Sequence, residues 1–325
     1  MSLFKDTSYK IFFATDIHGA DIVWKKFLNS IKIYKANVLI FGGDITGKAI
    51  IPIVKGDSQY ITTLYGNEAK LKSESELKEF MEIQKNKGYY PLLLSKEEHA
   101  ELQNNKELRD KKFKELMIER VGEWLKLAEE RLKGTGVKLL WEPGNDDPFE
   151  IDTLFKDTDT VIRISERVVD VADYHIVGLS YANTTPWHLP RDMPEDKLEE
   201  LIRNTLKSGH IDASRDNSDV IFAFHPPPYN TNIDSAPRVL ENLTYAKVGG
   251  QPDFINVGST SVRKIIEEIQ PLISLHGHIH ESKGIDRIKN TVIVNSGSEY
   301  SEGIVHGALI NLDGKKVKGY ILTTG

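Results

Sequence analysis

Residues 10–44, KIFFATDIHGADIVWKKFLNSIKIYKANVLIFGGD, decide the architecture of this chain. Residues 10–14 and 37–41 are short apolar runs, and between them residues 21–34 repeat apolar side chains at helical spacing. A strand, a helix and a second strand in this order predict two parallel strands joined by a crossover. Asp16 and Asp44 directly follow the two strands, and the carboxyl ends of parallel strands are where such folds place their chemistry.

The composition excludes several classes of protein. The 325 residues suffice to bury the core of one α/β domain with an insertion. The chain has no cysteine, so any metal must be held by nitrogen and oxygen ligands. The first residues are too polar for a signal peptide and no apolar run is long enough for a membrane span, so we expect a cytoplasmic protein. A formal net charge of −6 argues against a broad grip on nucleic acid.

Residues 68–133 are dense in charge, with 15 Lys and Arg against 15 Asp and Glu, which is typical of solvated helical surfaces. The pattern predicts helices at 68–87, 95–107 and 108–133, and the last carries apolar residues spaced for core packing. We therefore predict a single domain over residues 1–325 with a helical insertion or cap at 57–107. Further apolar runs predict later strands, and a capped helix is predicted at 259–269.

The stretch LHGHIH at residues 275–280 places His278 and His280 two residues apart after an apolar run. If the backbone stays extended, the two side chains project to the same side with their Cα atoms about 6.5 Å apart. That spacing suits two metal ions about 3.5–4 Å apart, each binding one imidazole. On this fragment alone, a structural pair of hydrogen-bonded histidines is the simpler interpretation.

Five short motifs that contain Asp, Asn or His follow predicted strands, one after another along the chain. They are Asp16-x-His18, Gly43-Asp44, Gly144-Asn145-Asp146, His225 and Gly277-His278-x-His280. This ordered set resembles the calcineurin-like metallophosphoesterase family, whose pattern runs D-x-H, G-D, G-N-H-[DE], H and G-H-x-H. Singly, an aspartate after a glycine at a strand end is ordinarily a turn residue, so the order carries the resemblance. The resemblance implies an α/β fold, a four-layer α/β/β/α sandwich of two mixed sheets.

The resemblance also implies a dinuclear metal site. Asp16, His18 and His280 would hold one ion, Asn145, His225 and His278 the other, and Asp44 would bridge them. Nitrogen and oxygen ligands without sulfur suit two divalent ions such as Mn, Fe, Zn, Co or Ni. The mechanism implied is in-line attack of a metal-activated hydroxide on phosphorus.

Asp146 departs from the family pattern, which has a histidine that contacts the phosphate and protonates the leaving group. Three resolutions are open: Asp146 is a protonated acid, or it turns away to bind backbone while His188 or another loop residue serves, or the leaving group needs no acid. We favour the second, because Trp187 and His188 lie in a proline-rich loop of the kind that borders pockets. Asp146 and His188 are therefore both candidate catalytic residues.

We expect a phosphoric ester hydrolase that acts on a small, nucleotide-like phosphate mono- or diester. Seven filled ligand positions favour an enzyme over the alternative, a metal-binding or protein-interaction scaffold of the same fold that lacks catalysis. A nuclease is a further alternative, but the acidic net charge disfavours it. We expect no membrane partner, and the oligomeric state is open.

Overall fold

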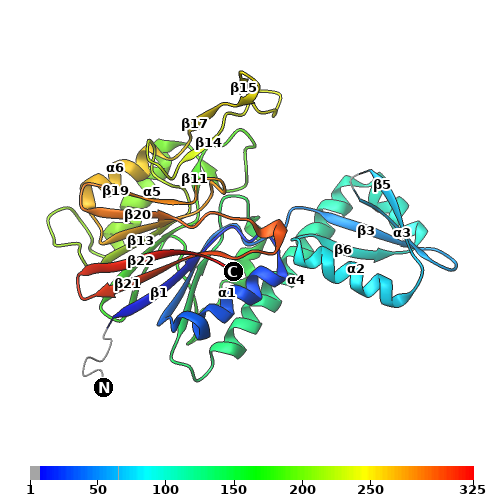
Figure 1. Ribbon diagram of the computed structural model, residues 1–325, viewed down its shortest axis with the longest axis horizontal. Coiled ribbons are helices and arrows are strands. Elements are labelled where there is room, and N and C mark those ends of the chain that lie inside the picture. Colours follow the sequence, from blue (N-terminus) through cyan, green and yellow to red (C-terminus); the bar gives the residue numbers. More distant parts are fainter. Residues whose placement is uncertain (1–7, 65) are drawn as a thin grey trace.

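The computed structural model describes residues 8–64 and 66–325, which form two large β-sheets packed face to face between helices (Figure 1). The first sheet has the order β22 (Lys316–Thr324), β21 (His306–Asp313), β1 (Tyr9–Ala14), β2 (Val38–Gly42), β7 (Lys138–Glu142) and β8 (Val161–Arg163). The second has the order β19 (Gly284–Ile288), β20 (Thr291–Asn295), β18 (Ile273–His276), β13 (Val220–Phe224), β10 (Tyr174–Leu179) and β9 (Val168–Val171). Both sheets contain parallel and antiparallel pairs.

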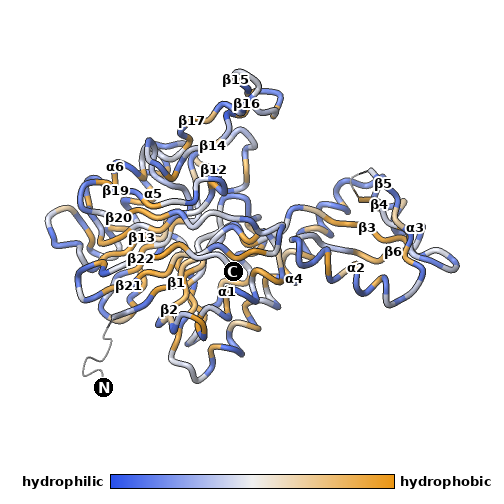
Figure 2. The backbone as a smooth tube through the Cα atoms, in the orientation of Figure 1, coloured by the Kyte–Doolittle hydropathy of each residue, from blue (hydrophilic) through white to orange (hydrophobic). Residues whose placement is uncertain are grey.

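Helices cover the outer face of each sheet, and the central strands therefore bury both faces. On β1, Ile11 and Phe13 pack between the sheets, whereas Phe12 and Ala14 pack under helices α1 (Asp21–Tyr34) and α4 (Lys106–Leu132). This alternation follows from the two-residue period of a strand. Helices α5 (Glu195–Ser208) and α6 (Thr260–Ile269) cover the second sheet. The predicted four-layer α/β/β/α sandwich is confirmed, and Figure 2 shows its strands as hydrophobic.

The insertion, predicted to be helical over residues 57–107, contains two helices but also strands, and its first strand already begins at Ile50, which corrects the sequence prediction. It contains a four-stranded sheet and two helices: β3 (Ile50–Lys55), β4 (Tyr60–Leu64), β5 (Asn67–Leu71), α2 (Glu74–Asn86), β6 (Tyr90–Leu94) and α3 (Lys96–Asn104). The charged helices α2 and α3 dominate the composition and concealed the short β-branched runs at 50–54 and 60–63. Figure 1 shows the insertion projecting sideways from the two sheets.

A second projection, the arm, spans residues 235–256 between β13 and α6 (Figure 1). Its strands are β14 (Ser235–Pro237), β15 (Lys247–Val248), β16 (Gln251–Pro252) and β17 (Phe254–Asn256). A two-stranded parallel pair, β11 (Ala182–Asn183) and β12 (Asp192–Met193), brackets the proline-rich loop, and short 3₁₀ turns η1 (Phe149–Leu154) and η2 (Tyr300–Glu302) complete the fold. None of the helices in the described ranges has the length and hydrophobicity that crossing a bilayer requires.

Glu142 ends β7 as a fully buried carboxyl group whose two oxygens have no hydrogen-bond partner among the described residues. The Leu179 amide approaches it without forming a hydrogen bond of ordinary geometry. Burial, and then the nearby Glu166 carboxylate, raise the pKa of Glu142 well above its usual range. A raised pKa in the folded state means that the folded protein binds more protons than the unfolded chain, so Glu142 destabilises the fold increasingly as pH rises above about 4.5.

The Glu142→Gln variant is therefore expected to unfold at a higher denaturant concentration than wild type at pH 8. Its free energy of unfolding should be larger by an amount on the order of 1–3 kcal/mol. At pH 4 the two proteins should differ little, because the wild-type carboxyl group is then protonated in both states. Urea unfolding of the metal-free proteins at both pH values measures this, with Glu130→Gln on the exposed face of α4 as control. An equal difference at the two pH values would contradict it.

Candidate metal centre

The loops that follow five strands meet at one edge of the sandwich. In the first sheet, β1, β2 and β7 are neighbours and carry Asp16 and His18, Asp44, and Asn145 in the loops after them. In the second, the neighbours β13 and β18 carry the other three candidates. Because parallel neighbours end at the same edge, residues far apart in sequence become adjacent. The structure thus brings all seven predicted ligands together.

Asp16, His18 and His280 form the first cluster, in which one ligand atom of each lies within 4.8 Å of the others. The Nε2 atoms of His18 and His280 are 3.0 Å apart, and Nε2 of His280 is 3.4 Å from Asp16 Oδ1. Two ring nitrogens that face each other at this distance can share at most one proton between them. A cation bound between them would satisfy both.

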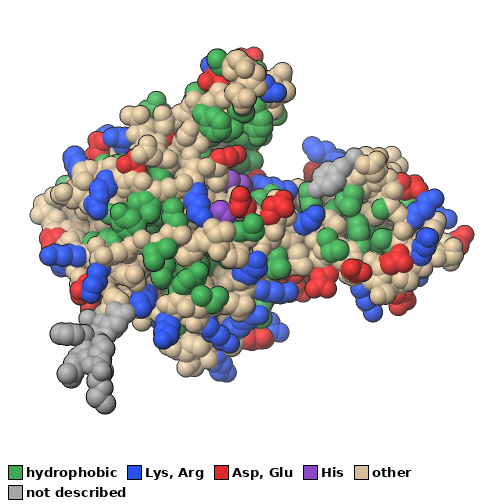
Figure 3. Space-filling model, in the orientation of Figure 1, with side chains coloured by type: hydrophobic (Ala, Val, Ile, Leu, Met, Phe, Trp, Pro, Cys, Tyr) green, Lys and Arg blue, Asp and Glu red, His purple; other side chains and the backbone are tan. Residues whose placement is uncertain are grey.

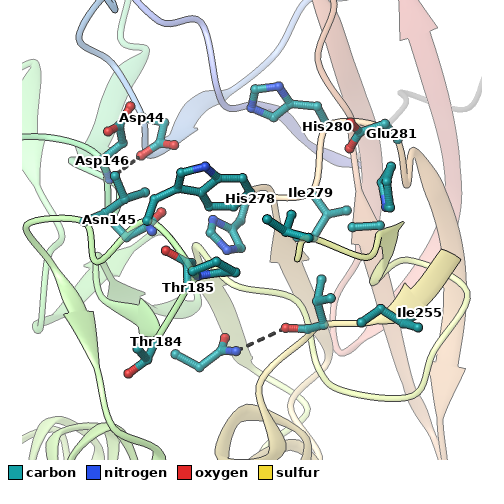
Figure 4. A pocket seen from close by; sticks show the side chains of 18 of the residues that line it. Asp44, Asn145, Asp146, Thr184, Thr185, Ile255, His278, Ile279, His280 and Glu281 are labelled. Atoms are coloured by element: carbon teal, nitrogen blue, oxygen red, sulfur yellow. Dashed lines mark hydrogen bonds between the residues drawn. The ribbon is translucent and has the colours of Figure 1, made fainter. Parts of the chain in front are cut away.

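Asp44, His225 and His278 form the second cluster, also within 4.8 Å. Asn145 extends it, since its Oδ1 lies 3.1 Å from His225 Nε2. Asp44 lies between the two clusters: its Oδ1 is 3.5 Å from His225 Nε2, and its Oδ2 is 3.7 Å from His18 Nε2. This is where a carboxylate that bridges two ions would have to be. Figure 4 shows Asp44 and Asn145 across the site from His278 and His280.

Neighbouring groups orient the candidate ligands. The Nδ1 atom of His225 donates to the Gly42 carbonyl at 2.8 Å, which leaves Nε2 facing the cluster. The Asn145 amide nitrogen donates to Asp192 Oδ1 at 2.7 Å, which turns its oxygen the same way. Asp16 accepts hydrogen bonds from the Thr15 hydroxyl at 2.7 Å and from the His278 amide. Such outer partners hold ligands in one orientation and are typical of metal sites.

The backbone is strained at four of the candidate metal-ligand residues. Asp16, His18, Asp44 and His278 have positive φ angles of 53°, 39°, 53° and 67°. Residues other than glycine seldom adopt this region, and such strain gathers at functional sites. The motif glycines allow close approach: a Cβ atom at Gly43 would lie 2.5 Å from His225 Nδ1, and one at Gly277 2.3 Å from Asp16 Oδ2.

The turn at Gly277 differs from the extended backbone considered for the LHGHIH stretch. Strand β18 ends at His276, and His278 is left-handed. The two histidines belong to different clusters, as the extended backbone also predicted. His276 points elsewhere: its Nδ1 donates to the carbonyls of Phe224 and Pro226 at 2.9 Å.

The pKa values in the centre reflect crowding of buried charges. Burial alone would lower the pKa of His225, but the facing Asp44 carboxylate raises it to about 9. Burial, and then the His225 charge, lower the pKa of His278 to about 4, so this imidazole is neutral as a ligand must be. Burial would raise the pKa of Asp16, yet His280 and His225 lower it to about 2. The donor types fit divalent cations, with ionised carboxylates, imidazoles and no sulfur, and a bound cation would take the place of the proton that the Asp44 carboxylate holds on His225.

Asp146 does not turn away to bind backbone, which corrects the favoured interpretation. Its carboxylate forms an ion pair with Lys48 and lies 3.9 Å from His18 Nδ1, while its amide donates to Asp44 Oδ1 at 3.0 Å. Burial, and then the Asp44 charge, raise the pKa of Asp146, and Lys48 opposes them. Bound cations would likewise favour the ionised carboxylate. Asp146 thus faces the site with a cation beside it.

His188 is exposed, and the structure does not place it in the wall of the site cavity, although its neighbours Trp187 and Leu189 line it. Sequence reasoning missed Lys48, Asp192 and Tyr300. The Tyr300 ring lies 4.8 Å from the His18 ring, centroid to centroid. Lys48 follows Asp44 by four residues, and this proximity was a signal in the sequence from which Lys48 could have been proposed as a site residue. Asp192 and Tyr300 carry no local signal, since tertiary folding alone brings them here.

A cavity of about 620 Å³ opens above the two clusters. Its floor is polar and includes His18, Asp44, Asn145 and His278. Its walls are mainly apolar and come from the loop at 184–189 and from the arm. In Figure 3, histidines lie at the bottom of a hollow beneath the hydrophobic side chains of the arm. No described residue between Ile50 and Asn104 lines this cavity, so the position of the insertion does not support a role as a cap.

No protein-family model matches the sequence. The uncharacterised protein MJ1162 of Methanocaldococcus jannaschii is 32% identical over 164 residues, and the match spans 49% of this chain and 63%, less than two thirds, of that protein. One solved crystal structure aligns with a TM-score of 0.54 at 16% identity, covering 98% of this chain and 99% of that one. TT1561 of Thermus thermophilus aligns with a TM-score of 0.50 at 14% identity and the same coverage. A dimetal phosphatase from Danio rerio reaches a TM-score of only 0.43 at 8% identity, covering 97% and 98% of the two chains, which is too distant to bear on activity.

These similarities concern the fold alone. They show that the whole described chain shares its fold with solved structures. The buried Asp and His clusters lie at the residues of the ordered motifs on which the resemblance to the calcineurin-like metallophosphoesterases rests.

Proposed function

We propose that this chain is a dinuclear metal-dependent phosphoesterase that hydrolyses a small, nucleotide-like phosphate mono- or diester. One observation carries the proposal: two ligand clusters share one edge of the fold, and the Asp44 carboxylate directs one oxygen toward each. Asp16, His18 and His280 would hold one ion, and Asn145, His225 and His278 the other. When bound, two divalent ions would polarise the phosphate oxygens and lower the pKa of a water molecule for attack on phosphorus.

The protein side chains would position the ester and balance its charge. Lys48 reaches the cavity from the Asp44 loop, and its ammonium is the one Lys or Arg group among the described lining residues. Burial would lower the pKa of Lys48, but Asp44 and Asp146 raise it, so it stays charged. A single ammonium suits one phosphoryl group better than a nucleic-acid backbone, which needs a basic track. A small ester is therefore favoured over a nuclease substrate.

Metal stoichiometry and turnover together test the proposal. Wild-type protein loaded with Mn²⁺ is expected to bind two ions per chain and to hydrolyse p-nitrophenyl phosphate or bis-p-nitrophenyl phosphate, and the preferred ester separates monoesterase from diesterase. The His280→Ala variant should bind one ion and lose turnover, because only the first cluster loses a ligand. A chain that binds no Mn²⁺ would overturn the proposal and favour a scaffold.

A further inference from the structure

The cavity above the clusters has apolar walls. Metal coordination and phosphate binding need polar groups, so they do not account for these walls. Three large side chains line them and remain substantially exposed: Trp187 at 50%, Tyr245 at 56% and Ile255 at 40%. Trp187 belongs to the proline-rich loop, whereas Tyr245 and Ile255 belong to the arm. Apolar surface held open beside a polar floor is typical of a ligand site in which few polar groups set orientation and hydrophobic walls supply affinity.

Hydrogen bonds and an ion pair stabilise the arm and its base. Its base is held by Asp234, a fully buried carboxylate that accepts hydrogen bonds from the amides of Asn230, Thr231 and Gly258 and from the Asn256 side chain. Further out, the amide of Arg238 donates to the Asp253 carbonyl at 2.7 Å, and their side chains form an ion pair.

The proline-rich loop is tied to the same base. The Asn183 side chain donates to the Val257 carbonyl at 3.1 Å. On its other side, Asp192 accepts hydrogen bonds from Thr185 and Leu189 and also from Asn145. These hydrogen bonds join the proline-rich loop to a candidate metal ligand on one side and to the base of the arm on the other.

We infer that the cavity binds phosphate esters through a flat aromatic group, which Trp187, Tyr245 and Ile255 hold while the phosphoryl group lies over the Asp and His clusters. This inference rests on the proposed function and names its substrate class. The cavity volume of about 620 Å³ far exceeds the space that a phosphoryl group fills, and no Lys or Arg among the described residues of its apolar walls is placed to hold a second phosphate. Aromatic side chains contributed by two segments suit a planar ring by stacking and edge contacts.

The test compares two ligands that are not hydrolysed, phenylphosphonate and methylphosphonate, by calorimetric titration of the Mn²⁺-loaded protein. They share the phosphonate and differ in the aromatic ring. We expect phenylphosphonate to bind at least about tenfold more tightly, since a single methylene in an apolar pocket already discriminates by about tenfold or more. Trp187→Ala and Tyr245→Ala should each weaken phenylphosphonate binding far more than methylphosphonate binding and so lose most of this preference.

Leu243→Ala is the matched control, because Leu243 is 55% exposed on the same arm but does not line the cavity. Fluorescence gives a second readout: the other three tryptophans, Trp24, Trp124 and Trp141, are buried, so phenylphosphonate should change the emission of wild type but not of Trp187→Phe. Equal affinities for the two phosphonates, or no binding of either, would overturn the inference. So would a dimer that Tyr245→Ala and Leu243→Ala both dissociate, because a second copy would then occupy the arm.

The outcomes separate this inference from the proposed function. A preference for phenylphosphonate without any turnover of phosphate esters would sustain the aromatic site and contradict the hydrolase. Turnover without that preference would sustain the hydrolase and overturn the aromatic site.

Discussion

The Asp44→Asn substitution is expected to lower kcat/KM for phosphate esters by at least about 10³-fold and to reduce bound Mn²⁺ below two ions per chain. Asp44 is the carboxylate placed between the clusters, 3.5 Å from His225 Nε2 and 3.7 Å from His18 Nε2. An amide keeps the shape but removes the negative charge and one good ligand oxygen. Both cations would then lose a ligand at once, which no other substitution among the seven ligand positions achieves.

Metal analysis after dialysis, with initial rates on p-nitrophenyl phosphate and bis-p-nitrophenyl phosphate, measures this effect. Asp170→Asn is the control, because Asp170 is an exposed aspartate on β9 that pairs with His175 far from the cavity floor. Two tightly bound ions with undiminished turnover in Asp44→Asn would show that this carboxylate does not bridge. A fall in thermal stability without loss of metal would assign it a structural role instead.

The Lys48→Met substitution is expected to lower kcat/KM by about 10²- to 10³-fold and to weaken inhibition by inorganic phosphate. Lys48 forms an ion pair with Asp146, the residue that replaces the histidine of the family pattern. Without the ammonium, the Asp146 carboxylate would face the substrate phosphate unpaired and repel it. Adding Asp146→Asn to Lys48→Met removes that repulsion and should recover about tenfold of the lost activity.

The double-mutant cycle distinguishes this account from a simple loss of packing. Lys318→Met is the matched control, since Lys318 pairs with Asp313 at 3.5 Å at the exposed edge of the first sheet. If Asp146→Asn lowers activity equally in both backgrounds, Asp146 does not act through Lys48. Lys48→Met activity within about twofold of wild type would remove Lys48 from substrate binding.

The ordered motifs of the sequence predicted the candidate metal centre through the resemblance that they carry, and each motif follows a predictable strand. An apolar run that forms a buried strand precedes each of five candidate ligands: Asp16, Asp44, Asn145, His225 and His278. Parallel neighbouring strands end at a common edge of their sheet. The ordered motifs predicted a set of seven ligand positions that the structure gathers into two clusters.

The same reasoning failed where the signal was not local. The insertion was expected to be helical, because charge density is a helical signal and short strands such as Ile50–Lys55 carry few residues to oppose it. Asp146 was expected to turn away, and the prediction overlooked its partner Lys48, which is 98 residues distant in sequence. His188 was favoured from its loop, but which side of a loop faces a cavity depends on the packing around it.

The sequence alone thus determined the sandwich, the strand-end loops and the chemical type of the ligands, since hydrophobic period and motif order are properties of neighbouring residues. Only the tertiary structure decided that Lys48 pairs with Asp146 and that Asp192 orients Asn145. It also decided that the arm, and not the insertion, lines the cavity. These contacts join residues whose separation along the chain is large. Their free energies depend on the packed geometry of the whole molecule, which no local pattern encodes.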